Sequence, residues 1–194
     1  MTRRGDRTVA AAAVATYSLL CLRHRARPGH REERAFRRVN ARSDRPWLRL
    51  PQQLGTPWTL PATALVLARR GRWPWALAAL LALPTEKAAE VATKKLVRRP
   101  RPAATVGTEV RDDAPTDGPG QPSGHAAIAA AASYLLARGT GSGTLGLLGA
   151  GGTALTSYVR VHQGAHWPAD VAAGVTLGVA VAATLASVVA ADES

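Results

Sequence analysis

The sequence predicts an all-α protein, an integral-membrane helical bundle with about six transmembrane helices. Three observations predict this class: uncharged runs recur along the 194 residues, two runs near the C-terminus are long, and small residues fill them. A helix rises about 1.5 Å per residue and the hydrocarbon core of a bilayer is about 30 Å thick, so roughly 20 apolar residues cross it. A chain of this length has room for one domain.

Six segments are candidate spans, and each is uncharged apart from a single histidine, His125, in the fourth. They are Thr8–Leu22, Leu50–Ala68, Trp73–Thr85, Pro122–Ala137, Gly139–Val159 and Val171–Ala191. The last two reach the required length and lack the polar face that a soluble surface helix needs. The other four are short, and we expect their flanking charged residues to face the protein interior or to snorkel to the interface.

The third span continues into charged residues that share one face. Glu86, Glu90 and Lys94 recur every four residues, so on a helix they are hidden from lipid together. The pair Gly174 and Gly178 in the last span predicts close helix packing, because small residues let membrane helices approach.

Residues near the ends of the spans are interpreted as interfacial. Arg98 and Arg99 are read as headgroup contacts or ordinary interfacial charges. Tryptophans at span ends predict an aromatic belt. They are Trp47, Trp58, Trp73, Trp75 and Trp167.

The N-terminal quarter is strongly basic. Residues 1–50 hold thirteen arginines against four acidic residues, a local charge of +9 out of +12 for the chain. Such a block binds nucleic acid or an anionic membrane, and the neighbouring uncharged runs favour the membrane. Residues 1–46 are predicted to be an N-terminal anchor and basic interfacial segment, retained because no small-residue cleavage site follows Leu22. Residues 47–194 are predicted to form the main membrane bundle. A single cysteine, Cys21, excludes internal disulfides.

Three polar clusters lie at the ends of these spans. They are "KKLVRRPRP" at 94–102, "QPSGH" at 121–125 and "RVHQGAHWPAD" at 160–170. The first closes the third span, the second opens the fourth and the third closes the fifth. Because consecutive spans cross the membrane in opposite directions, the end of the third span, the start of the fourth and the end of the fifth all lie on the same membrane face.

The clusters predict an anion site. Lys94, Arg101 and Arg160 are cations near a region of low dielectric constant, where an unpaired charge is costly, so an anion is expected among them. Arginine matches phosphate oxygens with two parallel hydrogen bonds. Ser123 and Gly124, at a helix start, add backbone N–H donors and a favourable dipole end. Phosphate fits this set best.

Two histidines add the capacity for chemistry. Imidazole can attack phosphorus and can donate a proton near neutral pH, which suits His125 and His166. Asp170 follows His166 by four residues, a spacing that can place its carboxylate against the ring. His162, His166 and Asp170 also have the spacing of metal ligands on a helix, but Pro168 interrupts such a helix and no fourth ligand is evident. His162 is interpreted as structural.

Together the motifs have one spacing: Lys94, six residues, Arg101-Pro102; Pro122-Ser123-Gly124-His125; and Arg160, five residues, His166, three residues, Asp170. This pattern resembles the three signature motifs of the type 2 phosphatidic acid phosphatase (PAP2) superfamily, and the surrounding spans resemble its six-span core. One position differs, because the family usually has serine before the last arginine and this chain has Val159.

The resemblance implies a metal-independent lipid phosphatase without a cofactor. His166 is then the nucleophile that forms a phosphohistidine, Asp170 orients it and His125 protonates the leaving oxygen. The implied phosphate-binding residues are Lys94, Arg101, Ser123, Gly124 and Arg160. The expected substrate is a lipid phosphate or diphosphate monoester of the isoprenyl diphosphate, phosphatidate or phosphatidylglycerol phosphate type.

The resemblance also implies a bacterial plasma-membrane protein with an extracytoplasmic site. The arginines oppose this orientation. Ten of them would lie on the outer face and seven on the cytoplasmic face, whereas membrane proteins usually carry more arginine and lysine on the cytoplasmic face. No nucleic-acid partner is expected, and no oligomeric state is predicted. The alternative function is a non-catalytic membrane protein that binds anionic lipid or nucleic acid through the N-terminal arginine block.

Overall fold

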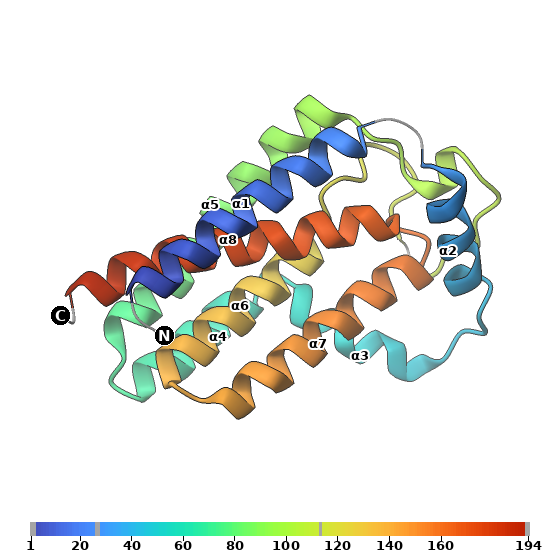
Figure 1. The fold of residues 1–194 in the computed structure, drawn as a ribbon. Helices are drawn as coiled ribbons and strands as arrows, with labels where there is room; N and C mark the ends of the chain where they lie inside the picture. Colours follow the sequence, from blue (N-terminus) through green and yellow to red (C-terminus); the bar gives the residue numbers. More distant parts are fainter. Residues whose placement is uncertain (1–2, 26–27, 113, 193–194) are drawn as a thin grey trace.

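The structure is a computed structural model that describes residues 3–25, 28–112 and 114–192. Within these ranges the chain forms eight α-helices and three short 3-10 helices (Figure 1). Residues 1–2 and 26–27 of the predicted N-terminal segment, and residues 193–194 of the predicted bundle, lie outside the described residues, as does residue 113. The prediction of an all-α fold is confirmed.

Six of the helices overlap the six candidate spans. They are α1 (Arg3–Arg23), α4 (Thr59–Arg69), α5 (Trp73–Val97), α6 (Gly124–Thr140), α7 (Gly143–His162) and α8 (Pro168–Asp192). The remaining elements lie between these helices: α2 (His30–Asn40), η1 (Pro46–Leu48), α3 (Arg49–Gln52), η2 (Gln53–Gly55) and η3 (Pro102–Ala104). Of these, α3 and η2 fall in the first part of the second candidate span.

Two of the candidate spans differ from the observed helices. Leu50–Ala68 is not one helix, because Thr56 has an extended backbone (φ −78°, ψ 156°), as expected for the residue before a proline. The run 139–159 is divided by Gly141, whose positive φ of 68° ends α6. By length and composition, one helix in the described part of the chain is long and apolar enough to cross a membrane, α8 over Pro168–Ala190, with a mean hydropathy of 2.0.

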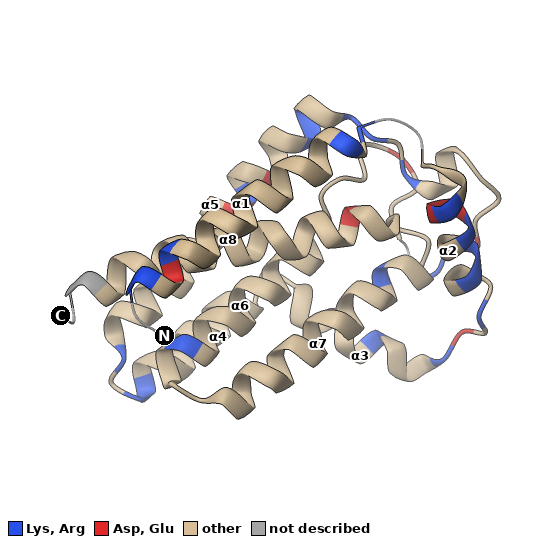
Figure 2. Ribbon diagram, viewed as in Figure 1, with Lys and Arg blue, Asp and Glu red and all other residues tan. Residues whose placement is uncertain are grey.

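Helix α8 is packed on several sides. It contacts α1, α5, α6 and α7, while α4 packs against α5 and α6. Figure 1 shows that α1 begins and α8 ends at one end of the bundle, whereas α2 lies at the other. Figure 2 shows α7 and α8 with little charge along most of their length and a concentration of charge on α2.

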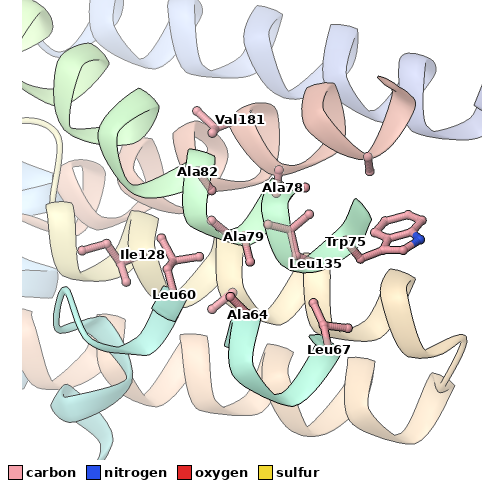
Figure 3. Packing of buried hydrophobic residues seen from close by; sticks show 14 of the residues in the cluster. Leu60, Ala64, Leu67, Trp75, Ala78, Ala79, Ala82, Ile128, Leu135 and Val181 are labelled. Atoms are coloured by element: carbon pink, nitrogen blue, oxygen red, sulfur yellow. The ribbon is translucent and has the colours of Figure 1, made fainter. Parts of the chain in front are cut away.

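The core between α4, α5, α6 and α8 is built mainly from alanine and leucine (Figure 3). The glycines of α8 allow α6 to approach closely. A Cβ atom at Gly174 would lie 2.3 Å from the Ser123 carbonyl oxygen, and one at Gly178 would lie 2.1 Å from the Ala127 carbonyl oxygen. The prediction that this pair serves helix packing is therefore confirmed.

The predicted inward stripe of α5 is also confirmed, since Glu86 and Glu90 are buried. Trp47, Trp58 and Trp73 are exposed, as residues of the predicted aromatic belt must be, and their place in such a belt stays a prediction. The prediction of a belt is wrong for Trp75 and Trp167, which are buried inside the protein. Burial of these two rings fills space between elements that the sequence pattern does not show to be neighbours.

Helix α1 packs as part of the bundle. Its buried Asp6 accepts hydrogen bonds from Tyr134 (2.7 Å) and Arg138 (2.8 Å) of α6, and the Tyr17 hydroxyl lies 2.5 Å from the Thr93 hydroxyl of α5. The segment predicted to be an anchor therefore contacts the helices that carry two of the three polar clusters.

Candidate active site

The three polar clusters meet at the end of the bundle that carries α2. The backbone N–H of Ser123 donates to the Asp170 carbonyl at 3.0 Å, which joins the second cluster to the third. Nη1 of Arg101 donates to the Ala165 carbonyl at 2.7 Å, which joins the first cluster to the third. The structure therefore brings together residues from the end of α5, the start of α6 and both ends of the α7–α8 connection.

His166 and Asp170 lie side by side in the buried connection between α7 and the first turn of α8. Nδ1 of His166 is 3.8 Å from Oδ2 of Asp170, close enough for electrostatic attraction but too far for a hydrogen bond. Oδ2 accepts the Trp167 backbone N–H at 2.9 Å, and Oδ1 accepts Nη1 of Arg99 at 2.7 Å. The carboxylate is thus held in place by groups other than the histidine.

The surroundings of His166 keep its imidazole neutral. Burial lowers the pKa of His166 to about 4, and the Asp170 carboxylate opposes part of this fall. The guanidinium groups of Arg101 and Arg160 add to the lowering. A neutral imidazole has a free lone pair, so His166 is in the nucleophilic form over the whole neutral pH range.

Polar atoms without partners converge on the same site. Among the described residues, Ser123 Oγ, Arg160 Nε and His166 Nδ1 are buried and make no hydrogen bond. Ser123 is the N-cap of α6, yet its side chain does not cap the helix. The Ser123 hydroxyl, at the N-terminus of α6, therefore remains available to an anion.

Lys94 lies in the last turn of α5, and its Nζ contacts Oε1 of Glu90 at 2.5 Å. Oε2 of Glu90 contacts Nζ of Lys87 at 2.5 Å. A Cβ atom added to Gly124 would lie 2.6 Å from the Glu90 carboxylate. Glycine at the start of α6 therefore lets the Lys94–Glu90 pair pack directly beneath the helix end.

A pocket of about 670 Å³ opens beside Lys94. Its lining includes Lys95, Arg98 and Pro100, while neither histidine of the site lines it. The pocket combines cationic side chains with an apolar surface at the end of the bundle.

His125 lies in the first turn of α6 and is partly buried. The 3-10 turn η2 packs on it, and a Cβ atom at Gly55 would come within 2.6 Å of both Cβ and the carbonyl oxygen of His125. Nothing in the sequence links Gly55 to His125, because 70 residues separate them. The glycine allows the backbone of η2 to approach the histidine.

Arg160 is supported by polar residues that the sequence pattern did not single out. Its Nη1 donates to Oε1 of Gln163 at 2.7 Å. Nε2 of Gln163 donates to Oδ2 of Asp112 at 3.0 Å and to Oε1 of Gln52 at 2.6 Å. Hydrogen bonding to Gln163, with burial opposing it, keeps the pKa of Asp112 below its ordinary value, so this carboxylate is ionised. The only sequence signal was the position of Gln163 inside the third cluster.

The interpretation of Arg99 as an interfacial charge is wrong. Arg99 is completely buried, and it contacts the Asp170 and Glu32 carboxylates. Adjacent Arg98 is exposed, as interpreted. The turn after α5, where Arg98 has a positive φ of 49°, directs these two neighbours differently.

The metal-ligand spacing of His162, His166 and Asp170 does not place them on one helix. Helix α7 ends at His162 and α8 begins at Pro168, in agreement with the predicted break. Nε2 of His162 lies 3.1 Å from the Arg42 carbonyl oxygen. Within the described ranges, no three His, Cys, Asp or Glu residues are grouped as metal ligands.

Comparison with known protein families matches residues 75–193 to the PAP2 superfamily. No curated protein sequence matches the chain. Among solved structures, LpxE of Aquifex aeolicus is 21% identical, with a TM-score of 0.65, covering 82% of this chain and 93% of its own. A transmembrane PAP2-type phosphatidylglycerolphosphate phosphatase of Bacillus subtilis is 19% identical, with a TM-score of 0.67, covering 91% of this chain and 93% of its own. At these identities the two likenesses establish the fold. Because the family match spans more than half of the chain and includes all three motifs, the protein belongs to the PAP2 superfamily of phosphatases.

Proposed function

We propose that the protein is an integral-membrane phosphatase that hydrolyses a lipid phosphate or diphosphate monoester through a phosphohistidine. The observation that carries this proposal is the position of His166, a neutral imidazole next to Asp170, at the point where Ser123 Oγ and Arg160 Nε lack partners among the described residues. Such a group of donors around a nucleophile suits a phosphoryl group.

In the proposed reaction, Nε2 of His166 attacks phosphorus while Nδ1 faces Asp170. The nitrogen–phosphorus bond forms, the bond from phosphorus to the ester oxygen (in a diphosphate, to the bridging oxygen) breaks, and His125 gives its proton to the leaving oxygen. Water then attacks the phosphohistidine and gives a proton to His125, which releases inorganic phosphate and restores His166. The Asp170 carboxylate stabilises the positive charge that the ring acquires.

The phosphoryl oxygens are proposed to bind cations and helix-start donors at the same end of the bundle. Arg160 and Arg101 are suited to this role because hydrogen bonds to Gln163 and to the Ala165 carbonyl already fix their guanidinium groups. The full proposed set is Lys94, Arg101, Ser123, Gly124 and Arg160. These residues supply fixed positive charge, so the reaction is proposed to need no metal or cofactor.

The substrate is proposed to be a lipid because the site lies at one end of a bundle of apolar helices. Helices α1, α4, α5, α6, α7 and α8 are proposed as the six spans. Residues 1–46 supply the anchor and interfacial segment, and residues 47–194 the catalytic bundle. Helix α4 is only 11 residues long, about 16 Å, so the segment from η1 to η2 must complete its crossing. The site is proposed to face outward from a bacterial plasma membrane.

The proposal is tested by phosphate release from the detergent-purified full chain. Isoprenyl diphosphate, phosphatidate and phosphatidylglycerol phosphate are the substrates to compare, each with and without EDTA. We expect release from at least one lipid that persists in EDTA and is inhibited by vanadate, which mimics five-coordinate phosphorus. No release from any of them, or release that stops in EDTA and returns with zinc or magnesium, contradicts the proposal.

A further inference from the structure

Arg99 links the proposed catalytic aspartate to a second carboxylate on α2. Its Nη1 donates to Oδ1 of Asp170 at 2.7 Å and its Nη2 donates to Oε2 of Glu32 at 2.5 Å. The Arg99 side chain is fully buried, and that of Glu32 is only 10% exposed. Water therefore screens this row of three charges weakly.

Glu32 also holds the start of α8. Its Oε1 accepts the backbone N–H of Ala169 at 3.0 Å, one residue before Asp170. One turn further along α2, the Phe36 ring packs on Trp167 with 4.9 Å between ring centroids. Helix α2 is thus attached on both sides of the backbone that carries Asp170, although it is far from Asp170 in the sequence.

The row formed by Glu32, Arg99 and Asp170 carries a net negative charge. Two carboxylates and one guanidinium sum to −1, which matches the +1 that the His166 ring acquires on phosphorylation or protonation. Without the charge of Glu32, Arg99 would neutralise Asp170 and leave no net negative charge beside the ring. Among the described residues, the other charged or titratable groups around this row and His166 include Arg101, Arg160, His125, Cys21 and, beside Glu32 at 3.6 Å, His24.

We propose that Glu32 and Arg99 are positioning residues for the nucleophile: Arg99 holds the Asp170 carboxylate in place, and Glu32 offsets the charge of Arg99 so that Asp170 still stabilises a cationic His166. The proposal rests on the proposed function for its catalytic meaning. The charge relationship itself is a property of the folded protein and is measurable without turnover.

The test is an NMR measurement of the histidine ring signals against pH, made on the full-length protein in detergent with isotope-labelled histidine. The chain has five histidines, and His166→Asn identifies the His166 signal. In Glu32→Gln the amide oxygen can still accept the Ala169 N–H, but the row becomes neutral. We expect the His166 pKa to fall by about half a unit or more. The matched control is Glu33→Gln on the same helix, where Glu33 pairs with Arg37 away from the site, and no shift is expected.

A double variant gives the decisive comparison. Glu32→Gln combined with Arg99→Gln leaves Asp170 alone, which restores a net charge of −1, so the His166 pKa should return toward the wild-type value. A purely structural role predicts the opposite, because a second buried substitution disturbs the site further. The proposal is overturned if the pKa of His166 in Glu32→Gln equals the wild-type value. It is also overturned if a folded double variant shows a His166 pKa further from the wild-type value than that of Glu32→Gln. If the double variant does not fold, the shift in Glu32→Gln alone decides the question.

Turnover measured on the same samples separates this proposal from the proposed function. We expect Glu32→Gln to lower kcat about tenfold with little change in KM, because the phosphate-binding groups are intact. If the wild-type protein releases no phosphate while the His166 pKa shifts and recovers as expected, the proposed function fails and the charge relationship stands. If the wild-type protein turns over and the pKa does not shift, the charge relationship alone is wrong.

Discussion

Oδ2 of Asp170 lies 3.8 Å from Nδ1 of His166, and both oxygens of Asp170 are already bound to other groups. Backbone and guanidinium donors hold the carboxylate beside the ring, so its orientation does not depend on the histidine. Because the two residues are not hydrogen-bonded, the carboxylate acts mainly through its charge. The effects of changing either residue follow from this geometry.

Replacing His166 with alanine should remove turnover by about ten-thousandfold or more, because no other described imidazole lies beside Asp170. Phosphate release and the melting temperature are measured together, so that loss of fold is not mistaken for loss of chemistry. His30→Ala, at the exposed start of α2, is the control and should retain activity. Turnover of His166→Ala within tenfold of wild type would exclude His166 as the nucleophile.

Replacing His125 with alanine should affect substrates unequally. A lipid ester leaves as a strongly basic alkoxide and needs a proton, whereas p-nitrophenolate leaves without one. We expect kcat to fall about a hundredfold more for the lipid substrate than for p-nitrophenyl phosphate. Equal losses on the two substrates would argue against the role of His125 as the acid.

Asp170→Asn keeps the shape of the side chain but removes its charge, and we expect turnover to fall about a thousandfold. The buried Arg99 also loses an ionic partner, so the melting temperature should fall as well. Adding Asp170→Asn to His166→Ala should reduce residual activity little further, because residues that act as a unit are not additive. Losses that multiply in the double variant would show that the two residues act independently.

The pKa of His166 determines the acid side of the pH profile. Attack requires the neutral ring, and burial lowers this pKa from 6.5 to about 4. We therefore expect kcat/KM to persist as the pH falls through 6.5 and to decline only near 4. The folded state binds fewer protons than the unfolded state between these values, so His166 makes the fold less stable as the pH falls through this window. An acid limb that begins at pH 6.5 and is unchanged in Asp170→Asn would contradict the assignment.

Gly178→Ala should destabilise the bundle, because the new Cβ atom would lie 2.1 Å from the Ala127 carbonyl oxygen of α6. We expect a cost of about 1 to 3 kcal/mol, typical of overpacking. Gly151→Ala in α7 is the matched control, since its Cβ would meet nothing within 4 Å and alanine favours a helix. The two melting temperatures should move in opposite directions. A Gly178→Ala protein as stable as Gly151→Ala would show that α6 and α8 are not in such close contact.

Part of the candidate site was predictable because it depends on local spacing. Lys94 and Arg101 flank the end of one helix, Ser123 precedes the start of another, and Asp170 follows His166 by less than two turns. Alternate crossing was then enough to place the clusters at the same end of the bundle. The inward face of α5 and the glycine contacts of α8 followed from helical periodicity and from the absence of side chains.

The sequence by itself determined that apolar helices dominate the chain and that the residues proposed to bind phosphate and to act as nucleophile gather at one end, since both depend on residue type and short-range periodicity. Only the tertiary structure decided that Glu32 meets Arg99, that Gly55 meets His125 and that Trp167 is buried under α2. It also decided that the second apolar run is broken at Thr56, so that its first part packs on α6 and only the residues after the break form α4. These contacts join segments separated by 67 to 131 residues. Whether two side chains on different elements meet depends on how those elements pack, and the neighbouring residues in the sequence do not determine it.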